Sequence, residues 1–143
     1  MGIHEFQKLL EKIPPFLNEK EKEEKIIQIS DLKRFTECYD SNIKIIDCIN
    51  SKVNIVEINK ERLGILFYEF KKIIDPLVFY ETFYDISHSG KSDNKELWFV
   101  FVEENSITNS GQFIDFIQEH KLSPLFDKIF LFQFSQAVIH QLK

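Results

Sequence analysis

The sequence predicts a mixed α/β fold in one domain, with helices packed on a mixed β-sheet of four to five strands. The chain has 143 residues, 43% of them hydrophobic, and only four glycines and four prolines, a length and composition typical of one globular domain. Segments with helical periodicity alternate with segments rich in β-branched and aromatic residues. The second half contains a strand, a helix and a strand in succession, and this crossover predicts parallel strands. The expected order is roughly α-α-β-β-α-β-β-α-β.

The first 40 residues are expected to form a helical segment ahead of a sheet-containing core at 43–143. Apolar residues recur at helical spacing in 3–13, and Pro14 and Pro15 end this helix because proline lacks the N–H donor and clashes with the preceding turn. The mixed-sign run EKEKEEK at 19–25 is typical of a solvated helix face or a mobile connector. A second, short helix is expected to start near Ser30, and the preceding IIQI is either its extension or a short strand.

The middle of the chain predicts a β-hairpin followed by a helix. The β-branched content is high in 43–58, where Asn50, Ser51 and Lys52 separate two strand-like runs. Asn59 is expected to cap a helix over 60–74, because the apolar residues there lie on one broad stripe. That stripe contains Leu63, Leu66, Phe67, Phe70, Ile73 and Ile74, and Pro76 prevents its continuation.

The rest of the chain predicts three strands and one more helix. The run VFYETFYDI at 78–86 is expected to pair antiparallel with LWFVFV at 97–102 across a polar loop. A helix over 111–121, capped by Ser110, then leads to a strand at 128–134 that runs parallel to 97–102. Because LWFVFV is apolar at every position, we expect an interior strand with both faces covered. The tail 136–142 is either a short helix or an extension of the last strand.

Composition argues against several functional classes. The net charge of −5 disfavours general nucleic-acid binding, which requires clustered Lys and Arg. No apolar run approaches the roughly 18 residues that span a membrane, and the first twelve residues carry Glu5 and Glu11. We therefore expect a soluble, cytoplasmic protein without membrane association. Cys38 and Cys48 are expected to be free thiols, because their spacing suits neither a disulfide framework nor a zinc site.

Acidic residues follow the apolar strand and are candidates for a binding site. Glu103, Glu104 and Asn105 lie at its carboxyl end, where open α/β sheets tend to bind ligands. We favour a non-catalytic protein–protein interaction module, such as an immunity or antitoxin-like inhibitor, whose acidic surface binds a basic partner protein. The candidate partner-binding residues are Asp85, Asp93, Glu103 and Glu104. This function needs no cofactor. A structural subunit of a larger assembly fits equally well, and a homodimer formed by edge pairing is a further alternative.

The element order expected over residues 60–134 resembles the restriction-endonuclease-like core of the PD-(D/E)xK nucleases. In that family an Asp precedes a Glu-x-Lys on the next strand, and the carboxylates hold a divalent metal. The resemblance implies an alternative, metal-dependent enzyme in which Asp85 and Glu103 bind Mg²⁺ or Mn²⁺. Asn105 stands where the family has lysine, so the positive charge that assists the attack is missing. An inactive relative of the fold therefore fits the sequence better than an active nuclease.

Overall fold

The computed structural model describes residues 3–40, 42–49, 51–69, 84–85, 87, 94–103 and 110–143. The described helices are α1 (Ile3–Glu11), α2 (Glu19–Tyr39), α4 (Ser110–Glu119) and the short 3-10 helix η1 (Phe134–Gln136). The strands are β1 (Lys44–Asp47), β2 (Val53–Ile58), β3 (Glu61–Glu69), β4 (Glu96–Glu103), β5 (Lys128–Gln133) and β6 (Val138–Gln141). The predicted mixed α/β fold is confirmed, with six strands in place of four to five.

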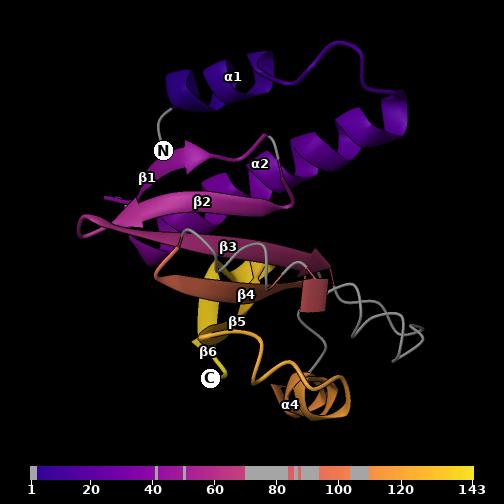
Figure 1. The fold of residues 1–143 in the computed structure, drawn as a ribbon, viewed down its shortest axis with the longest axis vertical. Coiled ribbons are helices and arrows are strands. Elements are labelled where there is room, and N and C mark those ends of the chain that lie inside the picture. Colours follow the sequence, from indigo (N-terminus) through magenta and orange to yellow (C-terminus); the bar gives the residue numbers. More distant parts are fainter. Residues whose placement is uncertain are drawn as a thin grey trace.

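The six strands form one sheet in the order β1-β2-β3-β4-β5-β6. The first three pair antiparallel, β3, β4 and β5 run parallel, and β6 returns antiparallel to β5. Helix α2 lies along one face of the sheet and α4 lies on the other (Figure 1). The parallel pairing of β4 with β5 confirms the predicted crossover through α4. The hairpin predicted within 43–58 is also confirmed as β1 and β2.

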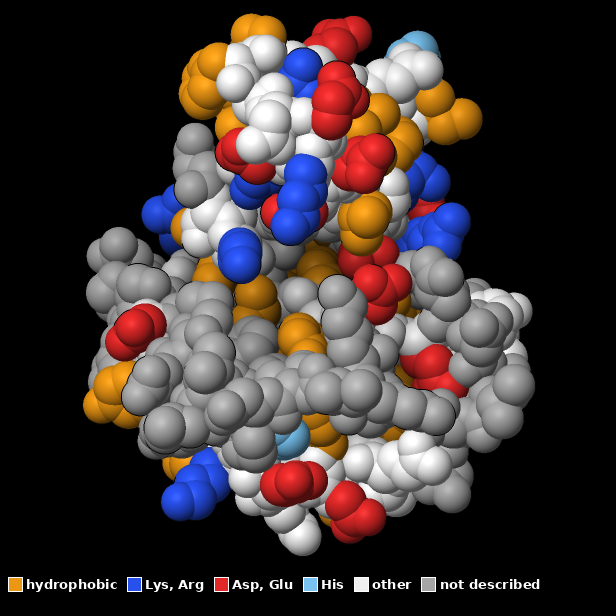
Figure 2. Space-filling model, turned by 90° about the vertical axis from the view of Figure 1, so that its right-hand side faces the viewer, with side chains coloured by type: hydrophobic (Ala, Val, Ile, Leu, Met, Phe, Trp, Pro, Cys, Tyr) orange, Lys and Arg blue, Asp and Glu red, His pale blue; other side chains and the backbone are white. Residues whose placement is uncertain are grey.

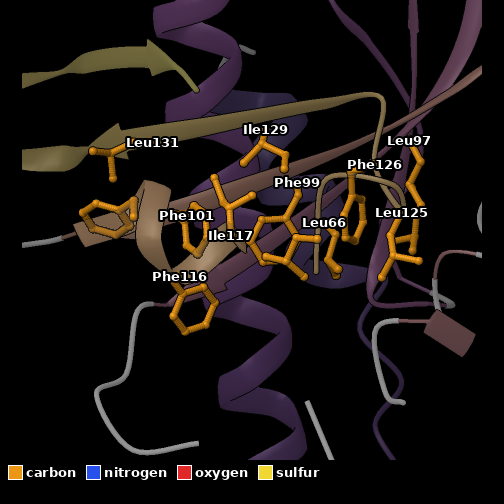
Figure 3. Packing of buried hydrophobic residues seen from close by; sticks show 13 residues of the cluster. Leu66, Leu97, Phe99, Phe101, Phe116, Ile117, Leu125, Phe126, Ile129 and Leu131 are labelled. Atoms are coloured by element: carbon orange, nitrogen blue, oxygen red, sulfur yellow. The ribbon is translucent and has the colours of Figure 1, made fainter. Parts of the chain in front are cut away.

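Strand β4 is the interior strand that the run LWFVFV predicted. All six side chains from Leu97 to Val102 are at most 3% exposed. Phe99 and Phe101 point into a core beneath α4 together with Phe113, Phe116 and Ile117 of that helix (Figure 3). Trp98 and Val100 belong to a second core beneath α2, which contributes Ile29, Leu32 and Phe35. Because successive strand residues face opposite sides, a strand between two cores is apolar at every position.

The predicted helix at 60–74 is wrong over the residues that the structure describes there. Residues Glu61–Glu69 form strand β3, which pairs antiparallel with β2 and parallel with β4; residues 70–74 lie outside the described part. Asn59 does not cap a helix. With Lys60 it forms the turn of the β2–β3 hairpin, and both have positive φ, 52° and 67°. A short apolar run buried on both faces has no strand periodicity, so it can imitate a helical stripe.

The strand predicted at 78–86 is wrong at Tyr84 and Asp85, which are helical. The rest of that range lies outside the described residues. The predicted antiparallel neighbour of β4 is wrong as well, because β4 pairs with β3 and β5 and is parallel to both.

The structure shows what the two segments near the chain ends form for which the sequence left alternatives open. The charged run at 19–25, the segment IIQI and the expected second helix are all parts of one 21-residue helix, α2. Its first turn is capped by Asn18, whose Oδ1 accepts a hydrogen bond from the Glu21 N–H at 2.9 Å. Neither alternative for the tail is correct, because the chain reverses after η1 and Val138–Gln141 form a separate strand, β6, antiparallel to β5. Among the described helices, none is both long and apolar enough to cross a membrane.

Candidate functional site

Three parallel strands finish with polar residues at one end of the sheet, which we call the polar end. The parallel strands β3, β4 and β5 finish there with Glu69, Glu103 and Gln133. Strand β1 runs in the same direction and finishes with Asp47. The carboxyl ends of parallel strands are the usual ligand-binding positions of open α/β sheets, so the polar end is the candidate functional site of this fold.

The two carboxylates that end β3 and β4 lie on opposite faces of the sheet. Glu103 is two residues after Phe101, whose side chain lies in the core beneath α4. Glu69 is two residues after Phe67, which packs against the core beneath α2, and its register partner is Val102. Because side chains alternate along a strand and registered neighbours share a face, Glu69 and Glu103 do not converge on one site.

On the α4 face, Glu103 is a neighbour of Gln133 in the β4–β5 register. Both side chains are buried, at 7% and 8% exposure. The Gln133 Oε1 atom lies 3.0 Å from Nε2 of His140 on β6, in a hydrogen bond that joins the last two strands. At this exposure, Glu103 contributes little to a surface that a partner protein touches.

On the α2 face, a polar group that the sequence analysis missed holds the β1–β2 turn. Gln28 of α2 donates from Nε2 to Asn54 Oδ1 at 2.8 Å and to the carbonyl oxygens of Ser51 at 3.0 Å and Cys48 at 3.2 Å. Lys25 donates from Nζ to the same Ser51 carbonyl at 3.0 Å. Asn54 is fully buried and donates to the Ile65 carbonyl at 3.0 Å. We call Lys25, Gln28, Ser51 and Asn54 the turn-anchoring cluster.

The lysine of this cluster is partly removed from water. Burial lowers the pKa of the Lys25 amine, and the neighbouring Cys48 and Asp47 act in the opposite direction. The Cys48 thiol is itself buried, and burial raises its pKa. Cys38 and Cys48 are both free, as predicted. The one sequence signal for the cluster was Asn54, a lone amide inside the β-branched run VNIVEI.

The structure describes two of the five residues that the sequence nominated. Asp85 is exposed in a short helical stretch, and Glu103 is buried at the end of β4. Asp93, Glu104 and Asn105 lie outside the described residues. Within the described ranges, no three His, Cys, Asp or Glu side chains form a group that could hold a metal ion. Metal binding by Asp85 and Glu103 therefore stays a prediction.

A Glu-x-Lys sequence does occur at the polar end, at a position the sequence analysis missed. Residues 69–71 read Glu-Phe-Lys, and Glu69 is exposed as the last residue of β3. Residues 70 and 71 lie outside the described part. The preceding strand, β2, has the buried amide Asn54 on the same face in place of a carboxylate. The predicted helix over 60–74 concealed this pattern, because only a strand ending at Glu69 places it at the end of a sheet.

Charges of both signs are mixed over the upper part of the surface in Figure 2. Over the N-terminal helices at the top of this view, Lys and Arg side chains alternate with Asp and Glu side chains. The run 19–25 that starts α2 has the same mixed signs. The N-terminal helices therefore present no one-signed patch in this view.

Comparisons with known proteins identify similar folds. No family model matches the chain, and no curated protein matches it. The crystal structure of an fdxN element excision controlling factor protein from Anabaena variabilis is similar, with a TM-score of 0.54 and 14% identity over 82% of this chain and 98% of that chain. An XisH family protein from Nostoc punctiforme is similar with a TM-score of 0.51 and 16% identity, over 78% of this chain and 94% of that chain. At this identity the likeness concerns the fold alone.

Proposed function

We propose that this chain is a non-catalytic module that binds a partner protein and controls its activity. The observation that carries the proposal is the separation of Glu69 and Glu103 on opposite faces of the sheet. A divalent-metal nuclease site needs carboxylates that converge on one ion. On the face of Glu69, the preceding strand offers the amide of Asn54, which is already engaged by Gln28 and by the Ile65 carbonyl.

The name of one similar structure supports a controlling role. One similar structure is described as a controlling factor for excision of the fdxN element. A factor that controls an excision reaction can act through contacts with the protein that performs it. We transfer that class of role to this chain, as a protein that binds and regulates another protein.

The partner surface that we propose is acidic and includes the polar end of the sheet. Glu69 and Asp85 are its exposed, described acids; Asp93 and Glu104 lie outside the described residues and stay candidates. Such a surface attracts a basic partner and raises the rate of association. Glu103 is buried, so its role in this proposal is to hold the end of β4, without contact with the partner.

A matched pair of charge reversals tests this proposal. Full-length protein is immobilised, incubated with an extract of the source organism, and the retained protein is identified and titrated. We expect Glu69→Lys with Asp85→Lys to weaken binding by about tenfold or more. The control reverses Glu5 and Glu11, two exposed acids of α1, and is expected to leave the affinity within about twofold. Equal binding by both double variants would refute the acidic surface.

A metal-dependent nuclease is the second candidate, and the Glu-x-Lys sequence at 69–71 favours it. Its test compares the wild type with Glu69→Gln, an isosteric change at an exposed position. A nuclease requires that Mn²⁺ or Mg²⁺ raise the melting temperature, because binding to the folded state stabilises it, and that DNA cleavage fall with Glu69→Gln. We expect neither effect. Cleavage that depends on Glu69 would replace the proposed binding role with this one.

A further inference from the structure

The outer side of strand β6 offers a surface for pairing with another strand. Val138–Gln141 pairs with β5 on one side, and no described element pairs with the other side. Val138, His140 and Gln141 are exposed. A terminal strand of this kind presents backbone N–H and C=O groups that can continue the sheet.

The two edges of the sheet differ in their protection against such pairing. Strand β1 begins with Lys44, ends with Asp47, and has an irregular register between Ile45 and Asp47. Charges and bulges are the usual devices that keep sheet edges apart. Strand β6, with the sequence VIHQ, has no Asp, Glu, Lys, Arg or Pro, and its register with β5 is regular throughout. Both edge strands are only four residues long, which limits pairing at either edge, but the β1 edge carries charges and a register shift and β6 carries neither.

Strand β6 is also held in place at both ends. Before the strand, Ala137 has a φ of 51°, and within it His140 is hydrogen-bonded to Gln133. After it, the Leu142 N–H donates to the Ile129 carbonyl at 2.7 Å. The Lys143 Nζ then donates to the carbonyls of Ser123 and Phe126. A strand fixed in this way loses little conformational entropy when it pairs with another strand.

We propose that β6 pairs antiparallel with β6 of a second copy of this chain, about a two-fold axis. A two-fold axis is the commonest symmetry of soluble oligomers. Pairing about such an axis brings the same surface of both copies into contact. Because β6 contains no Asp, Glu, Lys or Arg, self-pairing brings none of these charges together. Because four residues provide a small contact, we expect a weak dimer with a Kd on the order of 10 to 100 µM. This inference does not depend on the proposed function.

Two double lysine variants with the same added charge test the proposal. Val138→Lys with Gln141→Lys places four lysines at the two-fold contact, whereas Ile114→Lys with Gln118→Lys replaces a β-branched residue and a glutamine on the exposed face of α4. Sedimentation is measured over a range of concentrations, and circular dichroism checks that each variant is folded. We expect the wild type and the α4 variant to dimerise, and the β6 variant to dimerise at least about tenfold more weakly.

Hydrogen exchange of the wild type gives a second, independent readout. As the concentration rises through the dimerisation range, we expect exchange of the β6 backbone amides to slow, because new inter-strand hydrogen bonds protect them. A wild-type chain that is monomeric at about 500 µM, well above the expected Kd, overturns the proposal. So does a dimer that the β6 lysines leave intact, or a dimer whose β6 amides exchange at an unchanged rate.

Discussion

Leu97 and Asp127 exchange two hydrogen bonds at the start of the parallel strands β4 and β5. The Asp127 N–H donates to the Leu97 carbonyl at 2.9 Å, and the Leu97 N–H donates to Asp127 Oδ2 at 2.8 Å. The regular β4–β5 register begins directly after these residues, at Trp98 and Lys128. The Asp127 carboxylate thus accepts a hydrogen bond from the Leu97 N–H, which lies before the start of the regular β4–β5 pairing.

Removal of this carboxylate is expected to destabilise the fold. Asp127→Ala leaves the N–H of fully buried Leu97 without its acceptor, which costs about 1 to 3 kcal/mol of unfolding free energy. Asp127→Asn keeps a side-chain oxygen and is expected to lose less than half of that. Urea unfolding measures both variants. Equal stability of Asp127→Ala and the wild type would show that water replaces the carboxylate at no cost.

The sequence predicted the interior strand correctly and β3 incorrectly, and both outcomes have the same physical cause. In β4 the run LWFVFV is apolar at every position, which predicted an interior strand. In β3 the run LGIL is likewise buried on both faces, but it begins a longer apolar stripe at 60–74 that also fits a helix. The decisive contacts are distant in sequence: a Cβ on Gly64 would meet Val53 Cγ1 at 2.7 Å and Leu97 Cδ1 at 2.9 Å. Periodicity alone does not contain that information.

Lys60 has a left-handed backbone conformation, so we expect glycine at this position to increase the stability of the fold. Its φ of 67° and the φ of 52° at Asn59 are values that a two-residue hairpin turn requires and that glycine adopts without strain. Lys60→Gly is therefore expected to raise the unfolding free energy by about 0.5 to 1 kcal/mol. Thermal unfolding measures the change. Lys52, an exposed lysine outside the positive-φ residues, is the control, and Lys52→Gly is expected to lower stability.

Tyr68 is expected to make the fold sensitive to alkaline pH. Burial raises the pKa of Tyr68 from 10.0 to about 12, because the phenolate is poorly solvated beside Phe99, Phe101 and Phe116. The unfolded chain releases this proton first, so the stability that Tyr68 contributes is complete below pH 10 and is lost as the pH rises toward 12. Urea unfolding at several pH values is expected to give a steeper decline for the wild type than for Tyr68→Phe. An equal decline of the unfolding free energy with pH in both proteins would contradict this prediction.

Only part of the candidate site could be predicted from the sequence. Glu103 was nominated because it follows a strand, and the structure places it at the polar end. Its burial and its face depend on α4 and on the register with Gln133, neither of which is encoded locally. Gln28 and Asn54 are 26 residues apart, so their contact depends on how α2 lies against the hairpin. The site was therefore predictable as a strand end and unpredictable as a set of contacts.

The contact between Gln28 and Asn54 is expected to control both stability and the shape of the polar end. Gln28→Ala removes the donor to buried Asn54 Oδ1 and to the carbonyls of the β1–β2 turn, and an unsatisfied buried acceptor costs about 1 to 3 kcal/mol. A double-mutant cycle with Asn54→Ala is expected to give a coupling energy of about 0.5 to 3 kcal/mol. Gln118→Ala, on the exposed face of α4, is the control and is expected to change stability by less than about 0.5 kcal/mol. Additive effects of the Gln28 and Asn54 substitutions would mean that α2 does not anchor the turn through this pair.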